Sequence, residues 1–310
     1  MSESRRTFIK KAGSTALGAV MLSQAFQRVD AFPLGLAPGL QLWSVKDALA
    51  KDEDATLKLI AKIGYRELEI YELPKSPSSF KNKCTDLGMT LVGGHFYLHS
   101  LKSQKAIDAA RALGLRYMIA IFPTLRSLGE ADISKMSDAQ LNPLYEKITL
   151  DDYKWNAEQF NIFGEILKRQ GLQFGYHNHA VDLKRFGGAV GFDTLIESTD
   201  PNLVVFEMDC GHVIHAGADP IAYLRKFPTR IQLLHLKDLK PGYGISSSFD
   251  AEHKDTNAEI GAGVIDWKNL FHVAKQGNVK HCFVEHEGAM DRPPLQAIAR
   301  SYDYLQRIGM

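Results

Sequence analysis

The chain of 310 residues lacks the features that mark several common classes of protein. Three cysteines are too few for a disulfide scaffold, and no Cys-x-x-Cys or Cys/His zinc spacing is present. Lys and Arg number 37 against 36 Asp and Glu, so there is no general basic field for nucleic acid or an anionic membrane surface. No Gly-x-Gly-x-x-Gly follows the first strand-like run, which removes the main indication of a dinucleotide-binding fold.

The first 31 residues have the composition of a targeting segment. The run Ser4–Lys10 (SRRTFIK) resembles a twin-arginine export signal, and the apolar stretch from Ala12 to Phe26 is too short to span a bilayer comfortably. Cleavage after Ala25 or Ala31 is expected, followed by a periplasmic protein with no stable membrane insertion. A frayed, basic amphipathic helix is the alternative. The chain therefore divides into a signal at 1–31 and one domain at 32–310.

Short apolar runs recur along the rest of the chain. Several are apolar at nearly every position, as expected of parallel strands covered on both faces. The eight runs are Leu40–Val45, Glu67–Tyr71, Thr90–His95, Tyr117–Phe122, Gln173–His177, Val204–Asp209, Ile231–Leu236 and Cys282–Glu285.

Helical patterns alternate with these runs. Residues 55–63 have helical spacing and stop at Gly64, and residues 160–170 stop at Gly171. The same helix–glycine–strand pattern recurs at Gly88 and Gly114. Eight such units in about 270 residues predict a single-domain (β/α)8 TIM barrel rather than an open doubly wound sheet. Longer polar connections are expected at residues 123–153 and 240–265.

The last four predicted strands all end in side chains that bind metals. In a parallel barrel the carboxyl ends of the strands meet at one mouth, so these side chains should lie close together. Two imidazoles and two carboxylates there would suit one divalent ion, Mn, Zn, Co, Fe or Mg. A single strand-end histidine is more often structural, and an Asp before Gly often forms a turn, but four successive strands of this kind favour a metal site. The expected ligands are His177, Asp209, His235 and Glu285.

These motifs resemble the xylose-isomerase-like barrel superfamily of sugar phosphate isomerases and epimerases, which includes inosose dehydratase and endonuclease IV. The resemblance covers essentially the whole chain after the signal. It is carried by the segments 176–179 (YHNH), 208–212 (MDCGH), 216–220 (AGADP), 235–238 (HLKD), 261–267 (GAGVIDW) and 284–285 (VE).

The resemblance implies roles for individual residues. It places metal ligands at Asp209, His235 and Glu285, and a substrate-contacting histidine at His212. Lys237 would lie near the metal, where it could polarise a hydroxyl or bind an enediolate oxygen. The fourth ligand of the epimerases is a glutamate, and here His177 stands in its position.

That departure bears on the reaction. Two-base epimerases place a glutamate on each face of the substrate, and a histidine bound to metal cannot act as the second base. Glu285 is then the expected single base, with His212, His179 or Lys237 as acids. One base suffices for isomerisation on one face, for loss of water or for hydration. Alternatively, Glu287 or another carboxylate serves the second face.

The leading hypothesis is a metal-dependent isomerase or epimerase acting by proton transfer on a sugar or polyol, with a lyase or hydratase as the alternative. Trp43, His95 and His179 are further expected substrate contacts, although a core position for Trp43 is equally compatible. Glu69 is a solvated charge by default, or orients a ligand histidine.

Two other functions remain open. An endonuclease-IV-like nuclease would need a basic groove and a multinuclear zinc cluster, which the near-neutral charge disfavours. A non-catalytic sugar binder would have no need for the metal ligands. The expected partner is a small sugar or polyol, without nucleic acid, and a homo-oligomer is compatible with the sequence.

Overall fold

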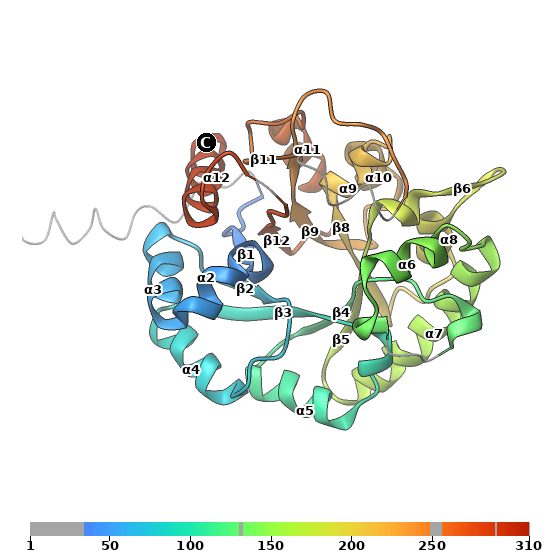
Figure 1. Ribbon diagram of the computed structural model, residues 1–310, viewed down its shortest axis with the longest axis horizontal. Coiled ribbons are helices and arrows are strands. Elements are labelled where there is room, and N and C mark those ends of the chain that lie inside the picture. The colour runs from blue at the N-terminus through green and yellow to red at the C-terminus, as the bar shows by residue number, and fades with distance from the viewer. Residues whose placement is uncertain (1–33, 130–132, 249–255, 289, 310) are drawn as a thin grey trace, which may run out of the picture.

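The computed structural model describes residues 34–129, 133–248, 256–288 and 290–309, so the predicted signal at 1–31 lies outside the described residues. Eight parallel strands close into a barrel in the order β1-β12-β9-β8-β5-β4-β3-β2, surrounded by helices (Figure 1). This confirms the predicted (β/α)8 barrel. The barrel strands are β1 (Gly39–Gln41), β2 (Glu67–Ile70), β3 (Thr90–Phe96), β4 (Tyr117–Ala120), β5 (Gln173–His177), β8 (Val204–Asp209), β9 (Ile231–Leu236) and β12 (His281–Val284).

Helices follow the strands around the outside of the barrel (Figure 1). At three helix ends the predicted glycine stops are left-handed, with φ of 72° at Gly88 and 76° at both Gly114 and Gly171. The helices are α2 (Lys46–Lys51), α3 (Glu53–Ile63), α4 (Pro77–Asp86), α5 (Gln104–Leu113), α6 (Asp138–Tyr145), α7 (Leu150–Arg169), α8 (Gly191–Glu197), α9 (Cys210–His215), α10 (Pro220–Lys226), α11 (Trp267–Ala274) and α12 (Pro294–Ile308).

The first predicted strand is wrong at its carboxyl end. Only Gly39–Gln41 pairs with β2, and Leu42–Val45 forms a 3-10 helix instead. The Gln41 side chain caps that helix by accepting a hydrogen bond of 3.1 Å from the Trp43 backbone N–H. The run of apolar residues continues past the end of β1 because Leu42 and Val45 are buried in the following 3-10 helix. Apolar composition alone therefore could not locate the end of the strand.

Two small hairpins supplement the barrel. One joins β6 (Arg185–Phe186) to β7 (Ala189–Val190), and the other joins β10 (Asp238–Leu239) to β11 (Asn257–Ala258). The long connection predicted at 123–153 contains α6.

The apolar residues form two separate cores. The larger core lies between the strands and the outer helices, and all three cysteines are buried and free. The smaller core fills the inside of the barrel, and its members alternate along the strands with residues of the larger core. It consists of Val92, Tyr117, Ile119, Val205, Leu233 and Phe283.

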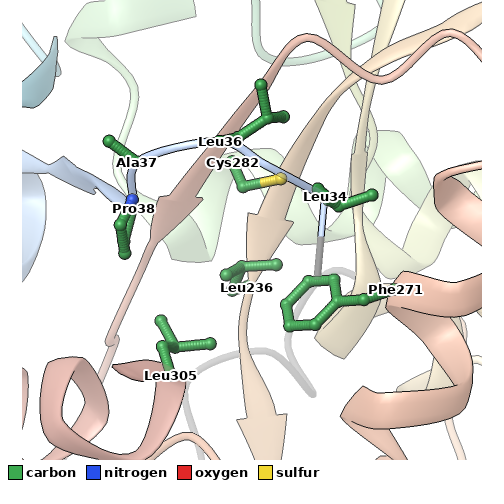
Figure 2. Close-up of a pocket in the computed structure, with 8 residues that line it drawn as sticks. All are labelled: Leu34, Leu36, Ala37, Pro38, Leu236, Phe271, Cys282 and Leu305. Atoms are coloured by element: carbon green, nitrogen blue, oxygen red, sulfur yellow. The ribbon is translucent and has the colours of Figure 1, made fainter. Parts of the chain in front are cut away.

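The described part of the chain begins with a segment that packs between the sheet and the last two helices. Leu34 and Leu36 cover a small cavity of about 20 Å³ against Leu236, Phe271 and Leu305 (Figure 2). The side chains around it are apolar and offer a water no hydrogen-bond partner, so we interpret it as a packing contact. Both predicted cleavage points precede this segment.

Among the described residues, none of the helices has the length and apolar character needed to cross a membrane.

The carboxylate of Asp238 organises the connection after β9. It accepts hydrogen bonds from the backbone N–H groups of Gly261, Val264 and Ile265 at 2.9–3.1 Å, and from Trp267 Nε1 at 2.8 Å. A carboxylate with this many donors holds the loop over the mouth-side end of the strand. The segment 261–267 is therefore a structural motif around Asp238.

We predict that Gly263→Ala destabilises the protein by about 1–3 kcal/mol, because the added methyl group would collide with the Asp238 carboxylate and the Leu239 carbonyl oxygen. Chemical denaturation measures the change. Gly244→Ala is the matched control in the same connection, since its added methyl group meets nothing within 4 Å. Equal stability of the two variants would contradict this account of the loop.

Candidate active site

Strand alternation places the polar residues in layers above the inner apolar core. Along β8, Val205 belongs to the inner core, and Glu207 and then Asp209 follow on the same face. Along β9, Leu233 is followed by His235 in the same way. The barrel interior therefore changes from apolar to charged toward the carboxyl ends of the strands.

The four predicted metal ligands meet at this mouth. His177 ends β5, Asp209 ends β8, His235 lies on β9, and Glu285 follows β12. Each offers one donor atom, and these atoms all lie within 4.8 Å of one another. His235 Nδ1 is 2.9 Å from Glu285 Oε2 and 3.9 Å from Asp209 Oδ2. All four residues are buried, so the sequence correctly predicted which side chains converge.

The orientation of Asp209 suits a metal ligand. Its Oδ1 accepts a 2.7 Å hydrogen bond from the His212 backbone N–H as the cap of α9, and this leaves Oδ2 facing the other ligands. Asp209 Oδ2 is buried and makes no hydrogen bond of suitable geometry, although Lys237 Nζ lies 3.0 Å away. Buried polar atoms are rarely left this way, and a divalent ion would satisfy this one. The residues present therefore fit a metal ion.

Lys237 is the centre of the charge network at the mouth. Its Nζ lies 3.0 Å from Asp209 Oδ2, 2.9 Å from Glu285 Oε2 and 2.7 Å from Glu287 Oε2. Burial opposes its charge, but these three carboxylates outweigh burial and raise the pKa of Lys237 well above its ordinary value. Lys237 is therefore a fixed cation at neutral pH.

Glu285 is ionised for the reciprocal reason. Burial favours its neutral form, but Lys237 and His235 outweigh burial and hold the pKa of the carboxyl well below its usual range. A buried, ionised carboxylate beside a fixed cation has the protonation state required of a general base.

His212 and His179 line the same mouth. Lys237 Nζ is 3.1 Å from His212 Nε2, and because an ammonium only donates, this ring nitrogen accepts the hydrogen bond. Burial and the nearby lysine lower the pKa of both His212 and His179 well below their ordinary value. The two rings are 4.7 Å apart, and His179 also stacks on Phe122 at 4.2 Å. Both are therefore neutral imidazoles.

A second polar layer lies directly beneath the ligands. Glu69 on β2 and Glu207 on β8 are fully buried, and both contact His95 Nε2 at 3.2 Å. His235 Nε2 lies 2.7 Å from Glu69 and 3.2 Å from Glu207. Burial opposes protonation of His95, but the two carboxylates raise its pKa to about 9. This layer holds the His235 ring from below while its Nδ1 faces the mouth.

A model of the family described as the xylose isomerase-like TIM barrel matches residues 57–308. The chain belongs to this family.

Three relatives illustrate its neighbourhood. An inosose dehydratase from Clostridium tetani is 30% identical over 53% of this chain and 58% of its own length, so the chain matches little more than half of that enzyme. A sugar phosphate isomerase/epimerase from Parabacteroides distasonis is similar in structure with a TM-score of 0.68 and 25% identity, over 87% of this chain and 93% of the other. The IOLI protein with a bound zinc atom has a TM-score of 0.61 and 14% identity, over 87% and 98%, and shows a shared fold alone.

Three further residues named in the sequence analysis, Trp43, Glu69 and His95, lie in different parts of the barrel. Trp43 is 37% exposed and packs edge-on against Tyr71, so the alternative of a core position for Trp43 is wrong. Glu69 is buried and contacts His235, so the default interpretation of Glu69 as a solvated charge is wrong. His95 lies in the lower layer, with its Nε2 directed at carboxylates.

Sequence reasoning missed the parts played by Glu207 and Gln41. Glu207 contacts three histidines, and the Gln41 side chain donates a 2.8 Å hydrogen bond to Glu69. Counting back two residues from Asp209 along a buried strand would have placed Glu207 on the inward face. No comparable signal marked Gln41, because the predicted first strand continued to Val45 and so placed Gln41 inside the strand rather than at its end.

His286 anchors the segment that carries Glu285 and Glu287. Its backbone N–H donates to Ser44 Oγ, and its Nε2 lies 3.0 Å from Ser301 Oγ of α12. Burial lowers the pKa of His286 to about 4, so the folded protein holds this ring neutral.

We predict that His286 contributes to acid unfolding. A folded pKa below the unfolded value stabilises the protein above about pH 6.5, and that contribution is lost as the pH falls toward 4, by on the order of 3 kcal/mol. His286→Gln should therefore flatten the loss of unfolding free energy between pH 6.5 and 4, measured by denaturation at each pH. His272→Gln, at an exposed position, is the control. An unchanged pH slope in His286→Gln would refute the assignment.

Proposed function

We propose that this protein is a metal-dependent enzyme that removes a proton beside the carbonyl group of a free sugar or keto-polyol and eliminates water from it. In this proposal Glu285 is the single carboxylate base. The observation that carries it is the pairing of Glu285 and Glu287 with one ammonium group, Lys237 Nζ, at 2.9 and 2.7 Å.

That pairing bears directly on the number of bases. A two-base epimerase needs carboxylates on opposite faces of the substrate. Glu287 is held on the same lysine as Glu285, so it extends the same side of the mouth rather than facing it. His177 occupies the position where the epimerases have their other glutamate. These contacts favour chemistry that one base completes.

The chain's own groups account for the proton movements of an elimination. The Glu285 carboxylate takes the proton from the carbon next to the carbonyl, and the electron pair forms a carbon–carbon double bond as the hydroxyl on the next carbon leaves. Lys237 and His212, joined by a 3.1 Å contact, supply the proton that turns the departing hydroxyl into water. Regeneration returns the Glu285 proton to solvent and restores from solvent the proton that Lys237 and His212 gave to the departing hydroxyl.

A divalent ion held by His177, Asp209, His235 and Glu285 would draw electron density from substrate oxygens and make the adjacent C–H group more acidic. The support for an ion is the set of buried donors within 4.8 Å of one another, among them Asp209 Oδ2, which makes no hydrogen bond of suitable geometry. The zinc in the IOLI protein is compatible with this.

The relatives support two reaction classes. The inosose dehydratase favours elimination of water. The sugar phosphate isomerase/epimerase keeps isomerisation on one face as the second candidate. The mass of the product separates them, because elimination removes one water and isomerisation leaves the mass unchanged.

We predict that Glu285→Gln lowers turnover by about 10²–10⁴-fold, because the amide cannot accept the substrate proton. The assay uses metal-loaded protein in D₂O with a panel of free inososes and 3-oxo sugars, and follows deuterium exchange and product mass. Glu158→Gln is the matched control, at an exposed position on α7 remote from the mouth.

Loss of exchange in Glu285→Gln but not in Glu158→Gln supports the proposal. If Glu285→Gln still exchanges the same carbon-bound proton at the rate of the unaltered protein, another group is the base. A product that has lost no water, whether or not it carries exchanged deuterium, assigns the reaction to the isomerase class.

We also propose that the protein acts in the periplasm on a sugar without a phosphate group, since phosphorylated sugars are scarce outside the cytoplasm. The support is the sequence of residues 4–10 alone. We predict that replacing Arg5 and Arg6 by lysine leaves the protein in the cytoplasm, as cell fractionation of both forms would show. Equal periplasmic recovery would contradict export by the twin-arginine route.

A further inference from the structure

The layer beneath the predicted ligands has the composition and geometry of a second ion site. We propose that His95, His177, Glu207 and His235 form a second site for a divalent transition-metal ion, one layer deeper in the barrel than the ion of the proposed function. This group is called the lower cage below.

The three distances from the Glu207 carboxylate to the histidine nitrogens are close to those between the ligands of a tetrahedral ion. Glu207 Oε2 lies 3.2 Å from His95 Nε2, 3.3 Å from His177 Nδ1 and 3.2 Å from His235 Nε2. Metal–ligand bonds of about 2.0–2.1 Å in a tetrahedron separate the ligand atoms by about 3.3–3.4 Å. All four donor atoms lie within 4.8 Å of one another.

Unpartnered buried atoms point to the same place. His177 Nδ1 and Glu207 Oε1 have no hydrogen-bond partner, although His177 is 1% and Glu207 0% exposed. Such atoms are costly inside a protein, and the cost is greatest for a charged carboxylate. An ion bound to His177 Nδ1 and Glu207 Oε2 would compensate both groups.

The surrounding groups complete a typical metal environment. Glu69 Oε2 contacts His95 Nε2 at 3.2 Å and His235 Nε2 at 2.7 Å, and it is held by the Gln41 side chain at 2.8 Å. Glu69 is therefore a second buried carboxylate beside the cage, and its negative charge favours a cation there. Four strands supply the four ligands, so the cage is part of the barrel wall and not of a mobile loop.

The donor types distinguish the two sites. The lower cage offers three imidazoles and one carboxylate, which favours zinc, cobalt or iron over magnesium. The upper set offers two imidazoles and two carboxylates. His177 and His235 belong to both sets. His177 Nδ1 and His235 Nε2 face the lower cage, and His235 Nδ1 faces Glu285. When both ions are bound, each shared ring has to bridge them as an imidazolate through its two nitrogens, so binding in the two sites is expected to be coupled.

Counting ions on the full chain tests the proposal. After chelation, the protein is titrated with Zn²⁺ and separately with Co²⁺, and the bound metal is measured by mass spectrometry after removal of free ion. We expect two ions per chain in the unaltered protein, and one in each of Glu207→Gln, His95→Gln and Asp209→Asn. The cobalt absorption spectrum should show two components, of which Glu207→Gln removes one.

Glu67→Gln is the matched control. Glu67 precedes Glu69 by two residues on β2 and contacts His281 at 2.8 Å at the opposite end of the barrel, outside both sets of ligands. It should keep two ions.

One bound ion in the unaltered protein overturns the proposal, as does retention of both ions by Glu207→Gln. The number of ions bound by the unaltered protein tests the proposal even if a variant does not fold. If the protein binds one ion and has full turnover, the lower cage is refuted and the proposed function stands. If it binds two ions but exchanges no proton, the proposed function is refuted and the lower cage stands.

Discussion

Everything at the mouth depends on the need to balance buried negative charge. Glu69, Glu207, Asp209 and Glu285 are almost completely buried inside the barrel, where an unpaired carboxylate is very costly. Lys237 supplies one permanent positive charge to the upper pair. The remaining charge has to come from protonated histidines, from metal ions, or from both.

Histidine protonation and metal binding are therefore alternatives. Carboxylate neighbours raise the pKa of His95 to about 9 and that of His235 well above its ordinary value, so both rings carry charge when no ion is bound. A metal needs the free nitrogen of each ligand ring, so ion binding releases protons and weakens as the pH falls. The same carboxylates that favour the imidazolium also favour the cation that replaces its proton.

The barrel could be predicted from the sequence because the same pattern, a buried strand-like run followed by a helical segment, recurs eight times. Buried runs and glycine stops at Gly88, Gly114 and Gly171 agreed with one another, so an error in one unit, such as the overlong run at Leu40–Val45, did not alter the fold. The convergence of the four predicted ligands could be predicted because each lies at or next to the carboxyl end of its own strand, and these ends of a parallel barrel meet at one mouth.

The two carboxylates of the lower layer, Glu207 and Glu69, could not be found in that way, because they lie inside strands rather than at their ends. Glu207 stands within a run of buried residues, and only inward-facing alternation with Asp209 marks it. Glu69 resembled a surface charge until its neighbours across the barrel were known. Which of the two nitrogens of His235 faces which carboxylate depends on contacts between residues far apart in the chain, and local pattern does not contain that information.

The central claim is that Asp209, His235 and Glu285 share one divalent ion at the mouth of the barrel. Anomalous diffraction from a crystal of the metal-loaded protein, collected on both sides of the absorption edge of the ion, tests it most directly. The account predicts an anomalous peak within about 2–2.5 Å of Asp209 Oδ2, His235 Nδ1 and Glu285 Oε2. The absence of any peak among these three atoms in a fully loaded crystal would contradict it.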